Sequence, residues 1–205
     1  MSSAVQNRRE ISTLAMPRVR DYLELFKVRI CILVLLTTSA GYFLGLRHPS
    51  DATTLLAVLI GTALVSASGC ALNQLIERHI DARMRRTANR PLPAGRLGPA
   101  EVLAIGIILG VSGIVLLAIA VSLSCSLVAA ITLFSYVLVY TPMKQKTPLA
   151  LLVGAVPGAL PPIIGWVGAG GGLDVDGFVL FGILFLWQLP HFLAIGWIYR
   201  QQYAM

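Results

Sequence analysis

Long uncharged apolar runs dominate the chain and are separated by short charged segments. A helix needs roughly 20 apolar residues to cross the hydrocarbon core of a bilayer. The pattern predicts six such helices, at residues 30–46, 53–76, two within 102–143, 147–173 and 177–199. Backbone groups inside lipid must pair within their own segment, so we expect an all-α polytopic membrane helical bundle.

Two irregularities are expected within these runs. Residues 102–143 are long enough for two helices, and the serine-rich stretch 122–126 marks the break between them. The fifth run contains Pro157, Pro161 and Pro162. Proline removes a backbone donor and clashes with the preceding turn, so this helix is predicted to bend.

Composition supports this class of protein. The 205 residues are 57% hydrophobic and only 12% charged, with a mean hydropathy of +0.80, whereas a soluble domain carries about 25% charged residues. Cys31, Cys70 and Cys125 lie in apolar stretches without the spacing of metal ligands, so they are interpreted as packing residues.

The distribution of basic residues predicts the orientation. With the N-terminus inside, only Arg47 of the 16 Lys and Arg residues lies outside. The net charge of +7 then reflects basic loops rather than a nucleic-acid partner. Residues 1–29 form the expected cytoplasmic N-terminal segment, and the C-terminus is also expected to be cytoplasmic. Acidic residues in this segment argue against an organelle transit peptide, so a bacterial inner membrane is the expected location.

The second apolar run ends in a line of oxygen-bearing side chains. Asn73, Glu77 and Asp81 are spaced i, i+4 and i+8, which places them in one helical stripe roughly 12 Å long. An amide and two carboxylates supply the hard oxygen ligands that Mg²⁺ prefers, and Mg²⁺ commonly bridges to substrate phosphates. The stripe therefore predicts a magnesium site.

Arginines follow this stripe. Arg83, Arg85, Arg86, Arg90 and Arg96 offer donors that match the oxygens of a diphosphate. The alternative is an ordinary cytoplasmic loop, in which the arginines obey the positive-inside rule and pair with the acids. Because the carboxylates lie where a helix leaves the membrane, a functional role is favoured.

Other basic groups are expected at the same membrane face. Tyr140 and Lys144 could reach phosphate oxygens, or they could be an interfacial aromatic residue and a simple anchor. Arg29, which follows Lys27 at the start of the first span, faces the same choice. His191 lies in the last span beside Gln and Pro. It could contact a metal, haem iron or substrate, or be a hydrogen-bonded packing residue.

Several motifs resemble those of a known family. The run from Asn73 to Pro93, which continues after Asp81 as Met84-x-Arg86-Thr87-x2-Arg90-Pro91-Leu92-Pro93, resembles the first signature of the protohaem IX farnesyltransferases (haem O synthases). These are a branch of the UbiA-type intramembrane prenyltransferases. Later signatures are matched in order by Tyr140-Thr141-Pro142-x-Lys144, the Gly- and Pro-rich residues 154–166, and Trp187-Gln188-x-Pro190-His191-Phe192.

The resemblance implies a reaction and roles. Family members transfer a farnesyl group from farnesyl diphosphate to a vinyl group of haem B, with water added. By position, Asn73, Glu77 and Asp81 would hold Mg²⁺ and act in catalysis. Substrate-binding residues would be Arg29, Arg86, Arg90, Tyr140, Lys144 and His191. Haem B would be a substrate rather than a cofactor, and the expected partners are the lipid bilayer and haem A synthase or other membrane proteins of the haem pathway.

Two departures from the family pattern accompany the resemblance. The family fold has about nine helices, so residues 30–205 are interpreted as a prenyltransferase domain that is incomplete at its C-terminus. Gln201 and Gln202 replace an acidic pair of the second metal-binding motif, which puts the second metal site in doubt. Two alternatives follow: a catalytically impaired, truncated homologue, or a small membrane transporter whose Gly- and Pro-rich helix lines a substrate path.

Overall fold

The computed structural model describes residues 18–47, 52–144, 146–147 and 149–198. This part of the chain is helical and has no β-strand. The helices are α2 (Val28–Gly45), α3 (Ala52–Asp81), α4 (Pro99–Ala120), α5 (Leu123–Phe134), the π-helix η1 (Ser135–Tyr140), α6 (Thr141–Met143), α7 (Ala150–Ala159), α8 (Pro161–Gly168) and α9 (Val175–Ile198). Residues 18–25 form a further short α-helix before α2.

Six spans in the described residues are long and apolar enough to cross a membrane, as the sequence predicts. They are Val28–Gly45, Ala52–Asp81, Pro99–Ala120, Leu123–Met143, Ala150–Gly168 and Val175–Ala194. Large apolar side chains cover the outside of the bundle, which suits a surface in contact with lipid. The chain is therefore a multi-pass membrane protein. Its orientation in the membrane stays a prediction, as does the division into a cytoplasmic segment, residues 1–29, and a transmembrane domain, residues 30–205.

Both predicted irregularities are present. α4 ends at Ala120, and the Ser122 hydroxyl caps α5 by accepting a hydrogen bond from the backbone N–H of Cys125 at 3.1 Å. The fifth span divides at Leu160 into α7 and α8. Pro161 begins α8, where its missing N–H costs little. The π-helix η1 was not expected from the sequence.

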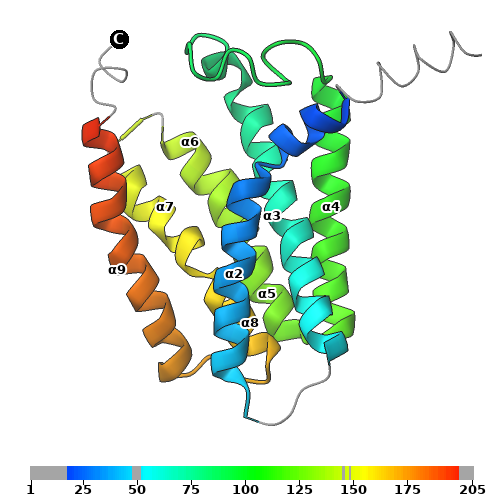
Figure 1. The fold of residues 1–205 in the computed structure, drawn as a ribbon, viewed down its shortest axis with the longest axis vertical. Coiled ribbons are helices and arrows are strands. Elements are labelled where there is room, and N and C mark those ends of the chain that lie inside the picture. The colour runs from blue at the N-terminus through cyan, green and yellow to red at the C-terminus, as the bar shows by residue number, and fades with distance from the viewer. Residues whose placement is uncertain (1–17, 48–51, 145, 148, 199–205) are drawn as a thin grey trace, which may run out of the picture.

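Polar segments gather at one end of the bundle (Figure 1). Residues 18–25, the 82–98 connection and α6 lie at this end. Arg96 ties the first two together, with its Nε 2.7 Å from Asp21 Oδ1. At the opposite end, Arg47 pairs with Asp174 at 3.1 Å. In the described part of the chain, the basic connection 82–98 and Lys144 therefore lie at one end of the bundle and Arg47 at the other, and which end faces the cytoplasm stays a prediction.

Helices α2 and α8 pack backbone against backbone. A Cβ atom added at Gly41 would lie 2.0 Å from the carbonyl oxygen of Pro162, and one added at Gly165 would lie 1.9 Å from that of Thr38. Small residues allow such close approach between helices in lipid, where packing rather than hydrophobic exclusion drives association. Because α2 and α8 lie this close together, no space is left between them for side chains or a ligand.

Candidate active site

The predicted stripe on α3 faces the protein interior. Asn73, Glu77 and Asp81 are 1%, 4% and 4% exposed. Because their spacing follows the helix repeat, all three side chains leave the same face of α3. Carboxylates buried to this extent require compensation, so their partners decide what the site can do.

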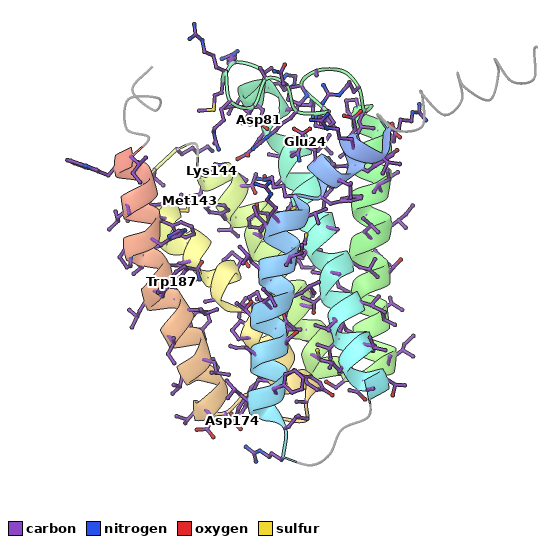
Figure 2. The ribbon with its side chains drawn as sticks, in the orientation of Figure 1. Glu24, Asp81, Met143, Lys144, Asp174 and Trp187 are labelled. Atoms are coloured by element: carbon purple, nitrogen blue, oxygen red, sulfur yellow. The ribbon has the colours of Figure 1, made fainter. Side chains whose placement is uncertain are left out.

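Each member of the stripe meets one cation from another segment. Lys27 donates to the Asn73 amide oxygen at 3.1 Å. The Lys144 ammonium lies 2.8 Å from Glu77 Oε1, and Arg90 Nη1 lies 2.6 Å from Asp81 Oδ2. Figure 2 shows Asp81 and Lys144 at the same end of the bundle. Three cations thus converge on the stripe from before α2, after α6 and within residues 82–98.

Two threonine hydroxyl groups form hydrogen bonds with the stripe, one with the side chain of Asn73 and one with the backbone of Asp81. The Asn73 amide nitrogen donates to Thr141 Oγ1 at 3.1 Å, and Thr141 in turn donates to the carbonyl oxygen of Tyr136 at 2.8 Å. Thr87 donates to the backbone carbonyl of Asp81 at 2.9 Å. Both threonines are buried. Their hydrogen bonds orient Asn73 and hold the Arg90-bearing connection against the end of α3.

Lys27 has an unusual backbone and a perturbed side chain. Its φ of 48° lies in the left-handed region, and this kink separates residues 18–25 from α2. Buried Gln74 donates to the carbonyl oxygens of Glu24 and Leu25, which anchors the chain just before the kink. Burial lowers the pKa of Lys27, and the charges of Arg90 and Lys144 lower it further. An arriving anion would relieve this repulsion.

A large cavity opens beside the stripe, which we call the mouth cavity. It has a volume of about 1640 Å³. Its polar lining includes Asn73 and the cationic or phenolic groups Arg20, Lys27, Arg29, Arg86, Arg90, Tyr140 and Lys144. All the predicted substrate-binding residues except His191 therefore line one cavity. Glu77 and Asp81 do not line it directly and instead lie behind Lys144 and Arg90.

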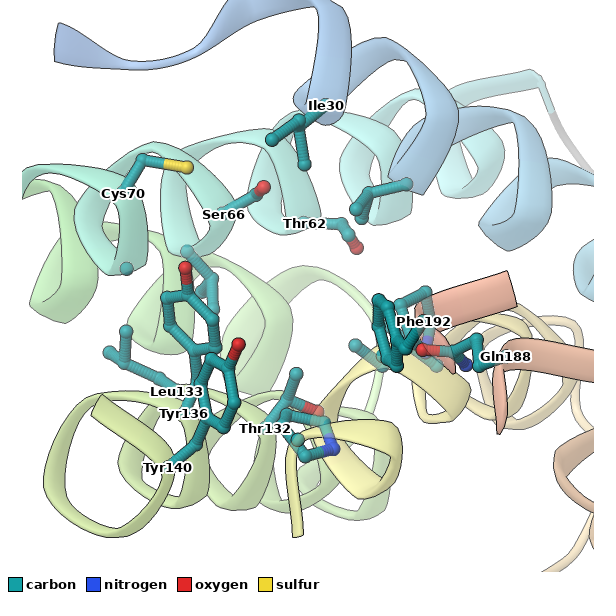
Figure 3. Close-up of a pocket in the computed structure, with 18 residues that line it drawn as sticks. Ile30, Thr62, Ser66, Cys70, Thr132, Leu133, Tyr136, Tyr140, Gln188 and Phe192 are labelled. Carbon is teal, nitrogen blue, oxygen red and sulfur yellow. The ribbon is translucent and has the colours of Figure 1, made fainter. Parts of the chain in front are cut away.

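A second, mostly apolar cavity of about 350 Å³ adjoins the mouth cavity, and we call it the inner chamber (Figure 3). Ile30, Tyr136, Tyr140 and Phe192 line both cavities. The two tyrosine rings stack with their centroids 5.5 Å apart, and both belong to η1, consistent with the frequent occurrence of π-helical turns at functional sites. The arrangement suits an amphipathic ligand with an anionic head and an apolar tail.

His191 is not brought to this site. Its side chain is exposed on α9 and stacks on Trp187 with ring centroids 5.0 Å apart. It lines neither cavity. Gln201 and Gln202, at the position of the second metal motif, lie outside the described residues. Thr141 was not predicted as a site residue. Lys27 was expected beside Arg29 at this membrane face, but its contact with Asn73 was not predicted.

The donor set suits one Mg²⁺ ion better than a transition metal. In the part of the chain that the structure describes, no three His, Cys, Asp or Glu side chains are grouped to hold a metal. The stripe offers two carboxylates and one amide, all oxygen ligands, beside cations that can take phosphate. Mg²⁺ retains waters and needs few protein ligands. Lys144 and Arg90, which now neutralise the carboxylates, could then turn to phosphate oxygens.

The fold and cavities define a class: membrane-embedded helical proteins in which a cavity lined by cationic side chains adjoins an apolar chamber. The chain belongs to the UbiA prenyltransferase family, whose profile matches residues 34–204. A protoheme IX farnesyltransferase from Solibacter usitatus is 48% identical and aligns over 91% of this chain and 67% of its own length. One from Anaeromyxobacter sp. is 49% identical, over 90% of this chain and 62% of its own length. The chain thus spans about two thirds of such relatives.

Solved structures support the fold. A digeranylgeranylglyceryl phosphate synthase matches with a TM-score of 0.74 at 24% identity, over 84% of this chain and 60% of that protein. A UbiA homolog from Archaeoglobus fulgidus, solved with GPP and Mg²⁺ bound, matches with a TM-score of 0.72 at 16% identity, over 89% and 65% respectively. At these identities the likeness establishes the UbiA-type architecture alone.

Proposed function

We propose that this protein is a haem O synthase-like prenyltransferase, which transfers a farnesyl group from farnesyl diphosphate to a vinyl group of haem B. One observation carries the proposal: an amide and two carboxylates on α3 are each paired with a cation that lines the mouth cavity, and this cavity adjoins an apolar chamber. The protoheme IX farnesyltransferases among its relatives support haem as the acceptor. The location is a bacterial inner membrane, with both termini cytoplasmic.

The residues of the mouth cavity would bind the diphosphate. The side chains of Arg29, Arg86, Arg90 and Lys144 line this cavity, and Lys27 adds a fifth cation. Guanidinium groups pair with phosphate oxygens in a bidentate manner, which fixes the head group and neutralises charge as it leaves. Asn73, Glu77 and Asp81 would hold Mg²⁺, which would further neutralise the charge of the diphosphate.

The inner chamber would protect the reacting carbon. When the bond to diphosphate weakens, the farnesyl group gains allylic cation character, and stray water would capture it. The inner chamber would keep water away from the farnesyl group because its lining is mostly apolar, with Val34, Val65, Leu133, Pro157 and Ile164. The stacked rings of Tyr136 and Tyr140 lie where the two cavities meet, and their π faces favour a nearby positive charge.

Haem B would enter from the membrane side of the mouth cavity. Its volume of about 1640 Å³ exceeds what a diphosphate needs. His191 stays a candidate haem contact on α9, through an exposed ring rather than from within the cavities described. Haem A synthase, which would receive the product, stays a proposed partner.

The direct test is product formation. The purified protein in detergent, given haem B, farnesyl diphosphate and Mg²⁺, is expected to form a heavier and more hydrophobic haem, measured by chromatography and mass spectrometry. Removing Mg²⁺ with a chelator should stop it. If a longer relative forms this product under the same conditions and this chain forms none, the activity proposal fails for this chain. Binding of farnesyl diphosphate without turnover would then support the impaired-homologue alternative.

A further inference from the structure

The inner chamber has a measurable depth along α3. Cys70 lines its upper part and Thr62 its lower part. Eight residues separate them, or about 12 Å at the rise of an α-helix, and Asn73 lies about 16 Å above Thr62. Figure 3 shows Cys70, Ser66 and Thr62 in succession along one helix, with the Thr62 side chain directed toward the chamber.

The chamber has a solid floor. On α2, Val34 lines it, but Thr38, one turn further, is fully buried and its carbonyl lies against Gly165 of α8. Below Thr62, the fully buried side chains of Tyr42 and Val58 belong to the main packed core. A ligand tail that descends from the mouth therefore meets closely packed helices at the level of Thr62.

The depth matches a particular length of prenyl chain. Each isoprene unit places four carbons in line, so with C–C bonds of about 1.5 Å it extends by about 5 Å. Three units span about 15 Å, nearly the distance from the level of Asn73 to that of Thr62. Resting on the proposed function, we propose that Thr62 forms the floor of the prenyl site and limits the donor to three isoprene units.

Thr62 is well suited to a clean test. Its side chain is buried, and its hydroxyl has no hydrogen-bond partner among the residues that the structure describes. Substitution therefore breaks no hydrogen bond within the described protein. A larger side chain at this position can occupy the chamber itself, which offers about 350 Å³, without displacing a neighbouring helix.

The test uses diphosphate analogues with ten, fifteen and twenty carbons, in which sulfur replaces the bridging oxygen to slow departure. Their affinities are measured in detergent with Mg²⁺. In the wild-type protein, affinity should rise by about tenfold or more from ten to fifteen carbons, as five further carbons are buried, and not rise again at twenty. Thr62→Phe should weaken the fifteen-carbon analogue by about tenfold or more and leave the ten-carbon analogue within about threefold.

Thr62→Val is the matched control, because it preserves the size of the side chain and should leave the order of affinities unchanged. Unchanged binding of the ten-carbon analogue to Thr62→Phe shows that the variant is folded. The proposal is overturned if wild-type protein gains as much affinity from fifteen to twenty carbons as from ten to fifteen. It is also overturned if Thr62→Phe binds all three analogues like wild type or weakens all three equally. None of these readouts needs haem, so the proposed haem chemistry can fail separately.

Discussion

Asp81→Asn is expected to weaken Mg²⁺-dependent binding of farnesyl diphosphate by about 100-fold, the upper range for loss of a group that supports a metal site. Asparagine has the same size and can still accept a hydrogen bond from Arg90, which now lies 2.6 Å from the carboxylate. Only the negative charge is lost. The substitution therefore tests the charge of the stripe rather than its packing.

Without Mg²⁺, the loss of affinity in Asp81→Asn should disappear or become a gain. Removing the Asp81 charge leaves Arg90 unopposed at the mouth cavity, so binding of diphosphate alone should be equal or tighter. The measurement is the ratio of affinities with and without Mg²⁺. Asp21→Asn is the control, because Asp21 is also buried and also pairs with an arginine, at 2.7 Å, but its partner Arg96 lines neither cavity, whereas Arg90 lines the mouth cavity. An Asp81→Asn protein with the wild-type ratio would remove Asp81 from the metal site.

The paired charges explain how a buried acidic stripe is stable before substrate arrives. Glu77 and Asp81 would be costly in the interior alone, but Lys144 and Arg90 neutralise them. Lys27 adds a third cation, which pairs with the neutral amide of Asn73. The three cations therefore outnumber the two carboxylates, and the net charge of the cluster is positive. Further positive charge from Arg29 and Arg86 lines the same cavity. This excess of positive charge supports the proposed binding of a diphosphate together with Mg²⁺.

Local regularities of the sequence predicted much of this arrangement. The six spans follow from the length of apolar runs, because lipid permits few alternatives to a helix. Asn73, Glu77 and Asp81 share a face because i+4 spacing nearly repeats the helical turn. Ser122 and the prolines near residue 160 act on their own turns, so their effects were also predictable.

Contacts between distant segments were not predictable in the same way. Lys27 and Asn73 are 46 residues apart, and their contact depends on the left-handed kink at Lys27. Gln74 anchors the chain just before this kink through the carbonyls of Glu24 and Leu25, which lie 50 and 49 residues earlier. The chamber depends on where α2 meets α8. The role of His191 was left open by the sequence, and the position of its exposed ring on α9, outside the lining of both cavities, depends on how α9 packs against the other helices.

Gly165→Ala is expected to have the largest effect on stability, a loss of about 3 kcal/mol in the free energy of unfolding, at the upper end for overpacking. The added methyl group would lie 1.9 Å from the Thr38 carbonyl oxygen and 2.6 Å from the Tyr42 backbone nitrogen. Neither atom can rotate away, because both belong to the backbone of α2. The helices must separate along their contact, which sacrifices packing on both sides.

Gly182→Ala supplies the control for this change. It lies in α9, and a Cβ atom there would meet no heavy atom within 4 Å, so alanine should stabilise the helix by about 0.5–1 kcal/mol. Thermal unfolding in detergent compares the two variants. Since α2 and α8 also form the floor beneath Thr62, any Gly165→Ala protein that folds should lose discrimination between fifteen- and twenty-carbon analogues. Wild-type stability in Gly165→Ala would show that α2 and α8 do not pack this closely.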